Sequence, residues 1–535
     1  MKDTKYIFVT GGVTSSLGKG IIAASLGKLL QARGFKVTNQ KLDPYINVDS
    51  GTLSPLEHGE CYVTVDGHEA DLDLGHYERF LNIETGKANN VTTGRIYQSV
   101  IDKERRGDFL GKTVQVIPHI TDEIKHNIKQ LGANGDLDFV ITEIGGTVGD
   151  IESLPYIESV RQLKWELGKN SLIIHLTYVP YVAAAKELKT KPTQHSVKLL
   201  QEQGVQADVL ILRTEHNIPQ DMREKVARFC NVAPNAVLQS IDVPTIYRVP
   251  MNMQEEKLDE VVLTKMGFDL AEIEPAKMDT WVEFVEKLEN ATKEVRIGLV
   301  GKYTQLPDAY KSIIESLLQA SAYNDRKLKL DLILSDNLSD KNVVQKLGKC
   351  DGVLVAPGFG ERGMEGKLAA LKYTRENDIP CFGICFGMHA MTIEFARNVL
   401  GYTDANSTEI DPKTAHKVVD FIDEQKNILN LGGSMRLGAH KCKLKKDSKA
   451  YEIYQKENIC ERHRHRYKFN NAYKDEFEKN GMKCSGLNED LNLVEVIEYT
   501  PNKWYIGVQY HPEYSSTVVN PHPLFISFVK AAIEK

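Results

Sequence analysis

Short apolar runs separated by amphipathic stretches dominate the first half of the chain. Residues 6–10, 139–142, 172–176 and 209–212 are almost wholly apolar, which is typical of strands buried on both faces. Residues 21–31 have the composition of a helix. Strands that alternate with helices favour a parallel sheet covered by helices on both faces. We therefore predict an α/β fold for this half of the chain.

The same pattern starts again near residue 296. Residues 296–301, 330–334, 352–355 and 380–384 are further apolar runs of the buried-strand kind. We predict a second α/β domain from this second cycle.

A polar stretch, residues 269–293, separates the two patterns. Within it Trp281, Phe284, Val285 and Leu288 follow the i, i+3, i+4, i+7 spacing of one apolar helical face. This spacing predicts a linker helix. The predicted division of the chain is residues 1–267 for the first domain, 268–293 for the linker helix and 294–535 for the second domain.

Composition narrows the class of protein. The 535 residues leave room for two to four domains. The formal net charge is −6 and the pI is about 6.2, so the chain lacks the overall basic balance of a typical nucleic-acid binder. We therefore expect no nucleic-acid partner.

The eight cysteines and the N-terminus point to an intracellular protein. The cysteines form no Cys-x-x-Cys pair, which argues against a zinc ribbon. The sequence opens without a secretory leader, and the apolar stretch 171–185 is interrupted by His175 and Pro180 and is too short to span a bilayer. We expect a cytoplasmic protein with reduced thiols and no membrane contact.

A glycine-rich segment, residues 11–20, lies between the first predicted strand and the first predicted helix. Its backbone N–H groups and the helix N-terminus would favour phosphate, and Lys19 would reach phosphate oxygens. The spacing departs from a Walker A motif, because five residues separate Gly12 from Gly18 and Lys19 is followed by Gly20. A magnesium-binding hydroxyl must then come from elsewhere, with Ser16 as a candidate.

Carboxylates near this segment would complete a nucleotide site. Asp71, Asp73 and Glu143 offer hard oxygen ligands for magnesium, and Glu143 follows a predicted strand at the edge where α/β sheets bind ligands. The basic loop 189–195 would hold the phosphates of a second nucleotide. Taken alone, each of these charged residues would be interpreted as an ordinary solvent-exposed surface residue.

A second set of residues is typical of nucleophilic catalysis. Cys385 lies in Gly383-Ile384-Cys385-Phe386-Gly387, where small residues permit a strained strand-to-helix turn and the helix N-terminus favours a thiolate.

A base and an oxyanion hole are available elsewhere in this half. His511 would act as the base, oriented by Glu513, and the segment 358–360 would supply oxyanion-hole amides. The basic run 462–467 is either a solvated loop or a site for a substrate carboxylate.

These motifs together resemble the CTP synthase family, which joins ammonia from glutamine to UTP. The resemblance covers essentially both halves of the chain. It rests on residues 6–20, 42–47, 71–80, 143–153, 189–197, 383–387, 462–467 and 511–513.

The resemblance implies a P-loop-type synthase domain followed by a class I glutamine amidotransferase domain of flavodoxin-like fold. The first would use ATP to phosphorylate the 4-oxygen of UTP, and the second would release ammonia from L-glutamine. The resemblance also implies a Mg²⁺ cofactor, activation by GTP near Lys302 and Arg362, feedback inhibition by CTP, and a homo-oligomer, expected to be a tetramer.

The resemblance assigns roles to particular residues. For ATP they are Ser16, Leu17, Gly18, Lys19, Gly20, Ile21, Asp73, Ile241, Asp242 and Val243. For UTP or CTP they are Ser15, Asp150, Ile151, Glu152, Lys189, Thr190, Lys191, Pro192, Thr193, Gln194 and Lys225. Magnesium would be held by Asp73 and Glu143, and Cys385, His511 and Glu513 would be catalytic. Glutamine would be bound by Gly358, Phe386, Gly387, Met388, His389, Glu409 and Arg466.

Two positions depart from the pattern of the family. Pro357 stands where the family commonly has glycine, and because proline has no N–H the oxyanion hole would rely on the amides of Gly358 or Phe359. His389 stands where the family commonly has glutamine, which puts the glutamine contact at that position in question.

Two other functions stay open on the sequence. One is a different glutamine-dependent synthetase, such as a cobyrinate amidase-like enzyme, and residues 71–80 and 189–194 argue against it. The other is a P-loop switch protein of the partition-ATPase type fused to an inactive amidotransferase-like domain. The intact Cys385, His511 and Glu513 argue against this second alternative.

Overall fold

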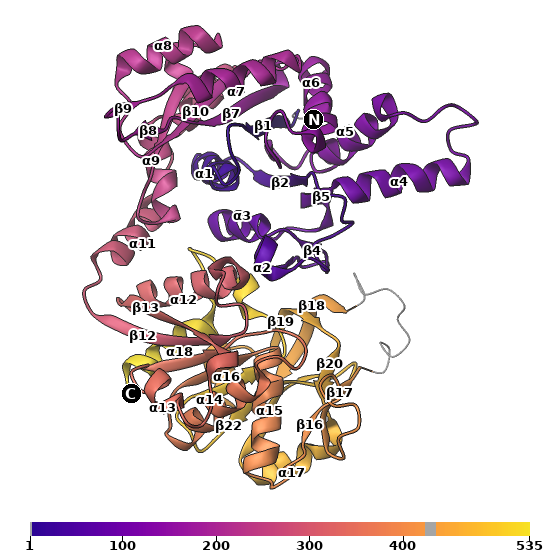
Figure 1. The fold of residues 1–535 in the computed structure, drawn as a ribbon, viewed down its shortest axis with the longest axis vertical. Coiled ribbons are helices and arrows are strands. Elements are labelled where there is room, and N and C mark those ends of the chain that lie inside the picture. Colours follow the sequence, from indigo (N-terminus) through magenta and orange to yellow (C-terminus); the bar gives the residue numbers. More distant parts are fainter. Residues whose placement is uncertain (1–2, 423–434) are drawn as a thin grey trace. The chain divides into compact units, whose positions relative to one another are not determined.

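The fold was obtained as a computed structural model that describes residues 3–422 and 435–535 (Figure 1). The chain forms two compact units. The first contains Met1–Asp49 and Asp73–Val282, and the second contains Ser50–Leu72 and Glu283–Lys535. The limits of the predicted domains, 1–267 and 294–535, stay a prediction.

The first unit is built on a seven-stranded sheet in which every neighbouring pair is parallel. This confirms the parallel sheet that the apolar runs predicted. In spatial order its strands are β11 (Val237–Ile241), β10 (Val209–Thr214), β7 (Ser171–Tyr178), β1 (Lys5–Gly11), β6 (Phe139–Ile144), β2 (Val37–Asp43) and β5 (Asn90–Thr92).

Helices cover both faces of this sheet. The step from β1 to β2 and the step from β6 to β7 run in opposite directions across the sheet, so right-handed crossovers place their helices on opposite faces. Figure 1 shows α1 and α6 on the two sides accordingly. The main helices are α1 (Lys19–Ala32), α3 (Asp73–Leu81), α4 (Thr93–Arg106), α5 (Thr121–Gln130), α6 (Leu154–Leu167), α7 (Lys191–Glu202), α8 (Gln220–Cys230), α9 (Val249–Glu255) and α10 (Leu258–Lys265).

The predicted linker helix is present as α11 (Asp279–Asn290). Trp281, Phe284 and Val285 are buried, which confirms the apolar stripe. Trp281 packs on Phe80 and donates a hydrogen bond from Nε1 to the carbonyl oxygen of Tyr247 over 2.7 Å. The start of α11 is therefore anchored in the first unit.

The second unit contains a nine-stranded mixed sheet. Its parallel part is β13 (Lys327–Leu334), β12 (Glu294–Gly301), β14 (Gly352–Val355), β15 (Cys381–Ile384) and β23 (Tyr505–Val508). It continues with four antiparallel strands, β22 (Leu493–Tyr499), β21 (Met482–Asn488), β18 (Arg436–Leu444) and β19 (Asn458–His465). The apolar runs predicted β12 to β15, but β18 and β19 carry many charged side chains and do not show as apolar runs.

The second unit also contains helices next to this sheet. They are α12 (Lys311–Tyr323), α13 (Val343–Leu347), α14 (Met364–Glu376), α15 (Phe386–Asn398), α16 (Lys449–Tyr454), α17 (Lys474–Lys479) and α18 (Pro523–Ile533). The segment Ser50–Leu72 adds α2 (Pro55–His58) and β3 (Tyr62–Val63), and β4 (Glu69–Ala70) pairs with β3.

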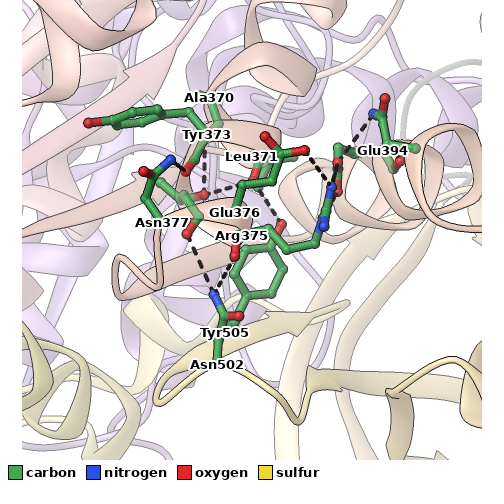
Figure 2. A network of polar contacts seen from close by, with 11 residues as sticks. Ala370, Leu371, Tyr373, Arg375, Glu376, Asn377, Glu394, Asn502 and Tyr505 are labelled. Carbon is green, nitrogen blue, oxygen red and sulfur yellow. Dashed lines mark hydrogen bonds and ion pairs between the residues drawn. The ribbon is translucent and has the colours of Figure 1, made fainter.

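A polar network joins α14 to α15 and to the start of β23 (Figure 2). Arg375 of α14 pairs with Glu394 of α15 over 2.8 Å, and their side chains are 9% and 0% exposed. Asn502, just before β23, donates from Nδ2 to the carbonyl oxygen of Arg375 over 3.0 Å. Tyr505 donates to the carbonyl oxygen of Leu371. The network thus fixes the helix that follows Cys385 against the strand that leads to His511.

No helix within residues 3–422 or 435–535 is both long and apolar enough to cross a membrane. All eight cysteines fall in this part of the chain, and within it none forms a disulfide.

Candidate functional site

The glycine-rich loop of the first unit lies at the carboxyl end of β1, as predicted. Lys19 is the first residue of α1, and Gly18 before it has a φ of 87°, a left-handed conformation that favours glycine. Lys19 donates from Nζ to the carbonyl oxygen of Gly146, which follows β6. Ser15 and Ser16 are exposed on the loop. The loop therefore presents backbone and hydroxyl groups to solvent at a helix N-terminus.

The space around Gly20 explains the departure from the Walker A motif. A Cβ at Gly20 would lie 2.4 Å from Oδ1 of Asp73 and 3.1 Å from Oε2 of Glu143. A serine or threonine at this position would therefore collide with Asp73. The carboxylate of Asp73 occupies the place where a Walker A hydroxyl would lie.

Lys41, which the sequence analysis did not single out, lies between the two predicted magnesium ligands. Its Nζ is paired with Asp73 and is 3.0 Å from Oε1 of Glu143. Tyr77 donates its hydroxyl to the other oxygen of Glu143. Lys41 follows an otherwise polar run in β2, and no apolar pattern marks it.

Burial governs the charges of this cluster. It raises the pKa of Glu143, and the nearby Asp73 carboxylate raises this pKa further, while Lys41 and Lys19 oppose the shift. Burial also lowers the pKa of Lys19, which Glu143 opposes. Two carboxylates that share one lysine and lie beside a phosphate-type loop provide the oxygen ligands that Mg²⁺ takes. The residues present therefore fit a magnesium ion.

The last three residues predicted for ATP, Ile241 to Val243, are connected to the loop through Arg213, a second residue that the sequence analysis missed. Ile241 ends β11, and Asp242 and Val243 follow it at the same edge of the sheet as the loop. Arg213 binds Oδ1 of Asp242 over 2.5 Å and donates to the carbonyl oxygen of Leu17 over 3.2 Å.

The predicted UTP and CTP residues lie on three loops of the same unit. Lys189 follows the hairpin of β8 (Tyr181–Val182) and β9 (Glu187–Leu188), and α7 begins at Lys191. Thr190, Thr193 and Gln194 are buried, whereas Lys191 is exposed. The remaining predicted residues are placed as follows: Pro192 in the first turn of α7, Asp150, Ile151 and Glu152 exposed ahead of α6, and Lys225 exposed on α8.

Cys385 sits at a strained turn between β15 and α15. Its φ is 51° and its ψ is −104°, a conformation that costs a non-glycine residue free energy. Its N–H donates to the carbonyl oxygen of Val508 in β23 over 2.7 Å. The Sγ atom donates to the carbonyl oxygen of Arg464 over 3.6 Å. The turn has the strained strand-to-helix form that the sequence predicted, and Cys385 itself is buried.

His511 and Glu513 lie beside this sulfur. Nδ1 of His511 is 2.7 Å from Oε1 of Glu513, and both side chains are buried. Burial alone would lower the pKa of His511, but the charges of Glu513 and Cys385 outweigh it and raise this pKa to about 10. His511 therefore holds a proton at neutral pH and places it beside the sulfur.

A cavity of about 450 Å³ opens onto these three residues. Its walls include Gly358, Glu409 and Arg466, three of the predicted glutamine contacts. Glu409 accepts a hydrogen bond from the N–H of Gly360 over 2.6 Å. The other predicted contacts form the buried first turn of α15 and do not line the cavity: Phe386, Gly387, Met388 and His389.

The segment Ser50–Leu72 forms another wall of the same cavity, which the sequence analysis missed. Arg464 binds Oε1 of Glu69 over 2.8 Å and donates to the carbonyl oxygen of Gly51. Arg462 donates to the hydroxyl of Tyr62 over 2.9 Å. Cys61 of this segment lines the cavity together with Cys385. Two arginines of the basic run thus bind the segment, and Arg466 faces the cavity.

The residues expected near GTP lie next to each other in the second unit. Arg362 donates to the carbonyl oxygen of Lys302 over 3.0 Å, and its other nitrogen binds Asp336 over 2.5 Å. Lys302 is buried, and its Nζ lies over the ring of Tyr303.

A buried group of two histidines and a glutamate has the residue types of a metal site. His463, His465 and Glu495 bring their nitrogen and oxygen atoms within 4.8 Å of one another. Nη1 of Arg436 lies 2.8 Å from Glu495 and 3.3 Å from a nitrogen of each histidine. The guanidinium therefore fills this group, and its chemistry is that of a buried ion pair.

Comparison with known proteins connects both units to one family. A family model described as the CTP synthase N-terminus matches residues 5–268, and one for class-I glutamine amidotransferase matches residues 305–531. The CTP synthase of Bacteroides fragilis is 67% identical over 535 residues, which cover 100% of both chains. Those of Porphyromonas gingivalis and Flavobacterium johnsoniae are 64% and 62% identical over 534 residues, covering 100% of this chain and 99% of theirs. The chain belongs to the CTP synthase family.

Proposed function

We propose that this enzyme converts UTP to CTP, using ATP and the ammonia that it releases from L-glutamine. One observation carries the proposal: this one chain of the family contains two different sites. One is a phosphate-type loop beside paired carboxylates, and the other is a cysteine–histidine–glutamate group at a cavity.

In the first unit the chemistry is phosphoryl transfer followed by amination. The 4-oxygen of UTP attacks the γ-phosphorus of ATP, and ADP leaves. Ammonia then attacks C4 of the pyrimidine, and the phosphorylated oxygen departs as inorganic phosphate to give CTP. Lys19 stabilises the charge on the phosphoryl group in flight. Asp73 and Glu143 would hold Mg²⁺, whose charge would offset that of the phosphates.

The nucleotides would occupy the loops at the carboxyl edge of the sheet. ATP phosphates would lie over residues 16–21, with adenine near Ile241, Asp242 and Val243. UTP, or CTP as inhibitor, would contact Ser15, the loop from Lys189 to Gln194, Lys225 and the turn at Asp150. Arg213 supports this arrangement, since it connects Asp242 to the phosphate loop.

In the second unit the chemistry is amide hydrolysis. The sulfur of Cys385, its proton held by His511, attacks the side-chain carbonyl carbon of glutamine. His511 then gives the proton to the leaving nitrogen, which departs as ammonia and leaves a thioester. Water, deprotonated by His511, cleaves the thioester to glutamate and frees the thiol. Glu513 holds His511 in place, and Arg466 would bind the α-carboxylate of glutamine.

Regulation and assembly belong to the same proposal. GTP would activate glutamine use through Lys302 and Arg362, and CTP would inhibit at the UTP loops. The chain would act in the cytoplasm as a homo-oligomer, a tetramer.

The test is an assay of CTP formation from UTP, ATP, Mg²⁺ and glutamine, with each component omitted in turn and with GTP added or withheld. The proposal expects CTP only when UTP, ATP and a nitrogen source are all present. Formation of no CTP under any condition would favour a different acceptor, and hydrolysis of ATP without amination would favour a switch protein.

The phosphate role of Lys19 has its own test. Lys19→Ala should remove CTP formation from both glutamine and ammonium ion, because both routes need the phosphorylated UTP. Glutaminase activity of this variant should persist, which reports a folded second unit. Normal CTP turnover in Lys19→Ala would contradict the assignment.

A further inference from the structure

A buried hydrogen-bonded path leads from α15 to the sulfur of Cys385. His389 lies in the first turn of α15, is 3% exposed and does not line the cavity. Its Nε2 is 2.8 Å from Oε1 of Gln509. Gln509 is also buried, and its Nε2 lies 3.9 Å from Sγ of Cys385, at which it points as a donor. The imidazole therefore reaches the nucleophile through one amide.

The tautomer of His389 sets the orientation of that amide. Burial lowers the pKa of His389 to about 4, so the ring is neutral at neutral pH and carries a single N–H. With this hydrogen on Nε2, the ring donates to Oε1 of Gln509, and the amide nitrogen of Gln509 turns toward the sulfur. The reversed amide would place its oxygen against the sulfur, where it would repel a thiolate.

The two contacts of Sγ suit different states of Cys385. A protonated Cys385 donates to the carbonyl oxygen of Arg464, and this contact is absent while the proton lies on His511. The amide of Gln509 is a donor and becomes stronger once the sulfur is charged. Of these two contacts, only that of Gln509 stabilises the attacking thiolate.

We propose that His389 is a positioning residue that holds the amide of Gln509 with its nitrogen facing Sγ of Cys385. This inference rests on the proposed hydrolysis of glutamine and replaces the direct glutamine contact expected for His389. Its effect falls on the reactivity of the sulfur, and the cavity that receives glutamine stays unchanged.

The experiment measures glutaminase kinetics of His389→Leu and His389→Gln. In His389→Leu the amide is free to turn, so kcat should fall about tenfold while KM for glutamine is unchanged. Glutamine at this position has an N–H₂ group that can donate to Oε1 of Gln509, so His389→Gln should recover most of kcat. Thr392→Val is the matched control, because Thr392 is equally buried on the same helix, and among the described residues its hydroxyl donates only to the carbonyl oxygen of Met388. It should behave as wild type.

A double variant separates positioning from a general loss of packing. If His389 acts through Gln509, then His389→Leu combined with Gln509→Leu should be no slower than Gln509→Leu alone. Ammonia-dependent CTP formation in each variant reports that the chain is folded.

Three outcomes would overturn the inference. They are a raised KM with unchanged kcat in His389→Leu, equal rates of His389→Leu and His389→Gln, and multiplicative effects in the double variant. Failure of the proposed function is a different result, because wild type would then not hydrolyse glutamine at all or Cys385→Ala would still do so.

Discussion

His511 carries its charge in a place from which water is largely excluded. Glu513 on one side and Cys385 on the other raise its pKa to about 10 against the effect of burial. A base with a raised pKa stays protonated until the pH passes that value, so the ring can give a proton to departing ammonia across the neutral range. The charge of one residue thus sets the pH range of glutamine hydrolysis.

This charge predicts the alkaline limb of the pH profile. Glutaminase kcat/KM should stay level above neutrality and fall as the pH rises through about 10, where His511 loses its proton. Glu513→Gln removes the carboxylate that raises this pKa, so the limb should move to lower pH. The measurement is kcat/KM for glutamine between pH 6 and 10.5 at constant ionic strength. An unmoved limb in Glu513→Gln would show that another group titrates.

The close packing around Gly20 leads to a second prediction for a single residue. A Cβ there would lie 2.4 Å from Oδ1 of Asp73, so Gly20→Ser should displace the carboxylate or the start of α1. A displacement of about 1 Å at a reacting centre costs about a hundredfold in rate, and CTP formation from ammonia should fall by that order. Glutaminase activity of the same variant should persist. Gly34→Ser is the control, because nothing lies within 4 Å of a Cβ at Gly34. Its positive φ adds some local strain, but it should leave CTP formation near the level of wild type.

At the scale of elements, α15 and β23 must keep their relative positions because each leads to a catalytic residue. The Arg375–Glu394 pair and the bonds of Asn502 and Tyr505 join α14, α15 and β23 away from the cavity (Figure 2). Burial raises the pKa of Glu394, and the Arg375 guanidinium opposes that shift. The pair therefore holds a charge that would otherwise be costly in the interior.

Removing one partner of this pair should destabilise the second unit. Glu394→Ala removes the buried partner of the Arg375 guanidinium and leaves it the half-exposed Glu376 at 3.5 Å, which costs about 3–5 kcal/mol. Urea unfolding followed by the exposure of cysteines to a thiol reagent would measure the loss. Lys530→Ala is the control, since Lys530 and Glu534 form an exposed pair 4.0 Å apart, worth about 0–1 kcal/mol. Equal midpoints for the two variants would contradict the role given to the network.

Some elements could be predicted from the sequence, whereas others could not, because contacts between distant residues determine their side-chain pattern. Strands buried on both faces, such as β1, β6 and β10, are continuous apolar runs and were predicted. β19 contains Arg462, His463 and Arg464, whose side chains are held by partners from other parts of the chain, so its pattern resembles a polar loop. The turn at Cys385 was predicted from its small neighbours. Lys41, Arg213 and Gln509 were missed, because their roles come from contacts between residues distant in sequence.

At the scale of the whole molecule, one segment packs in a different compact unit from the residues that surround it in the sequence. Residues of Ser50–Leu72 precede most of the first unit in the sequence but pack in the second, where Arg462 and Arg464 bind them. The two sites otherwise lie on separate units, each with its own sheet. We therefore expect single substitutions to separate the two half-reactions.

The most direct test of the account follows nitrogen through Cys385→Ala. Wild type and variant would be supplied with UTP, ATP, Mg²⁺, glutamine labelled with ¹⁵N in its amide, and unlabelled ammonium ion. The account predicts labelled CTP from wild type, and from Cys385→Ala unlabelled CTP at the ammonia-dependent rate with no glutamate formed. Labelled CTP from the variant, or loss of CTP from both nitrogen sources in a folded variant, would contradict the account.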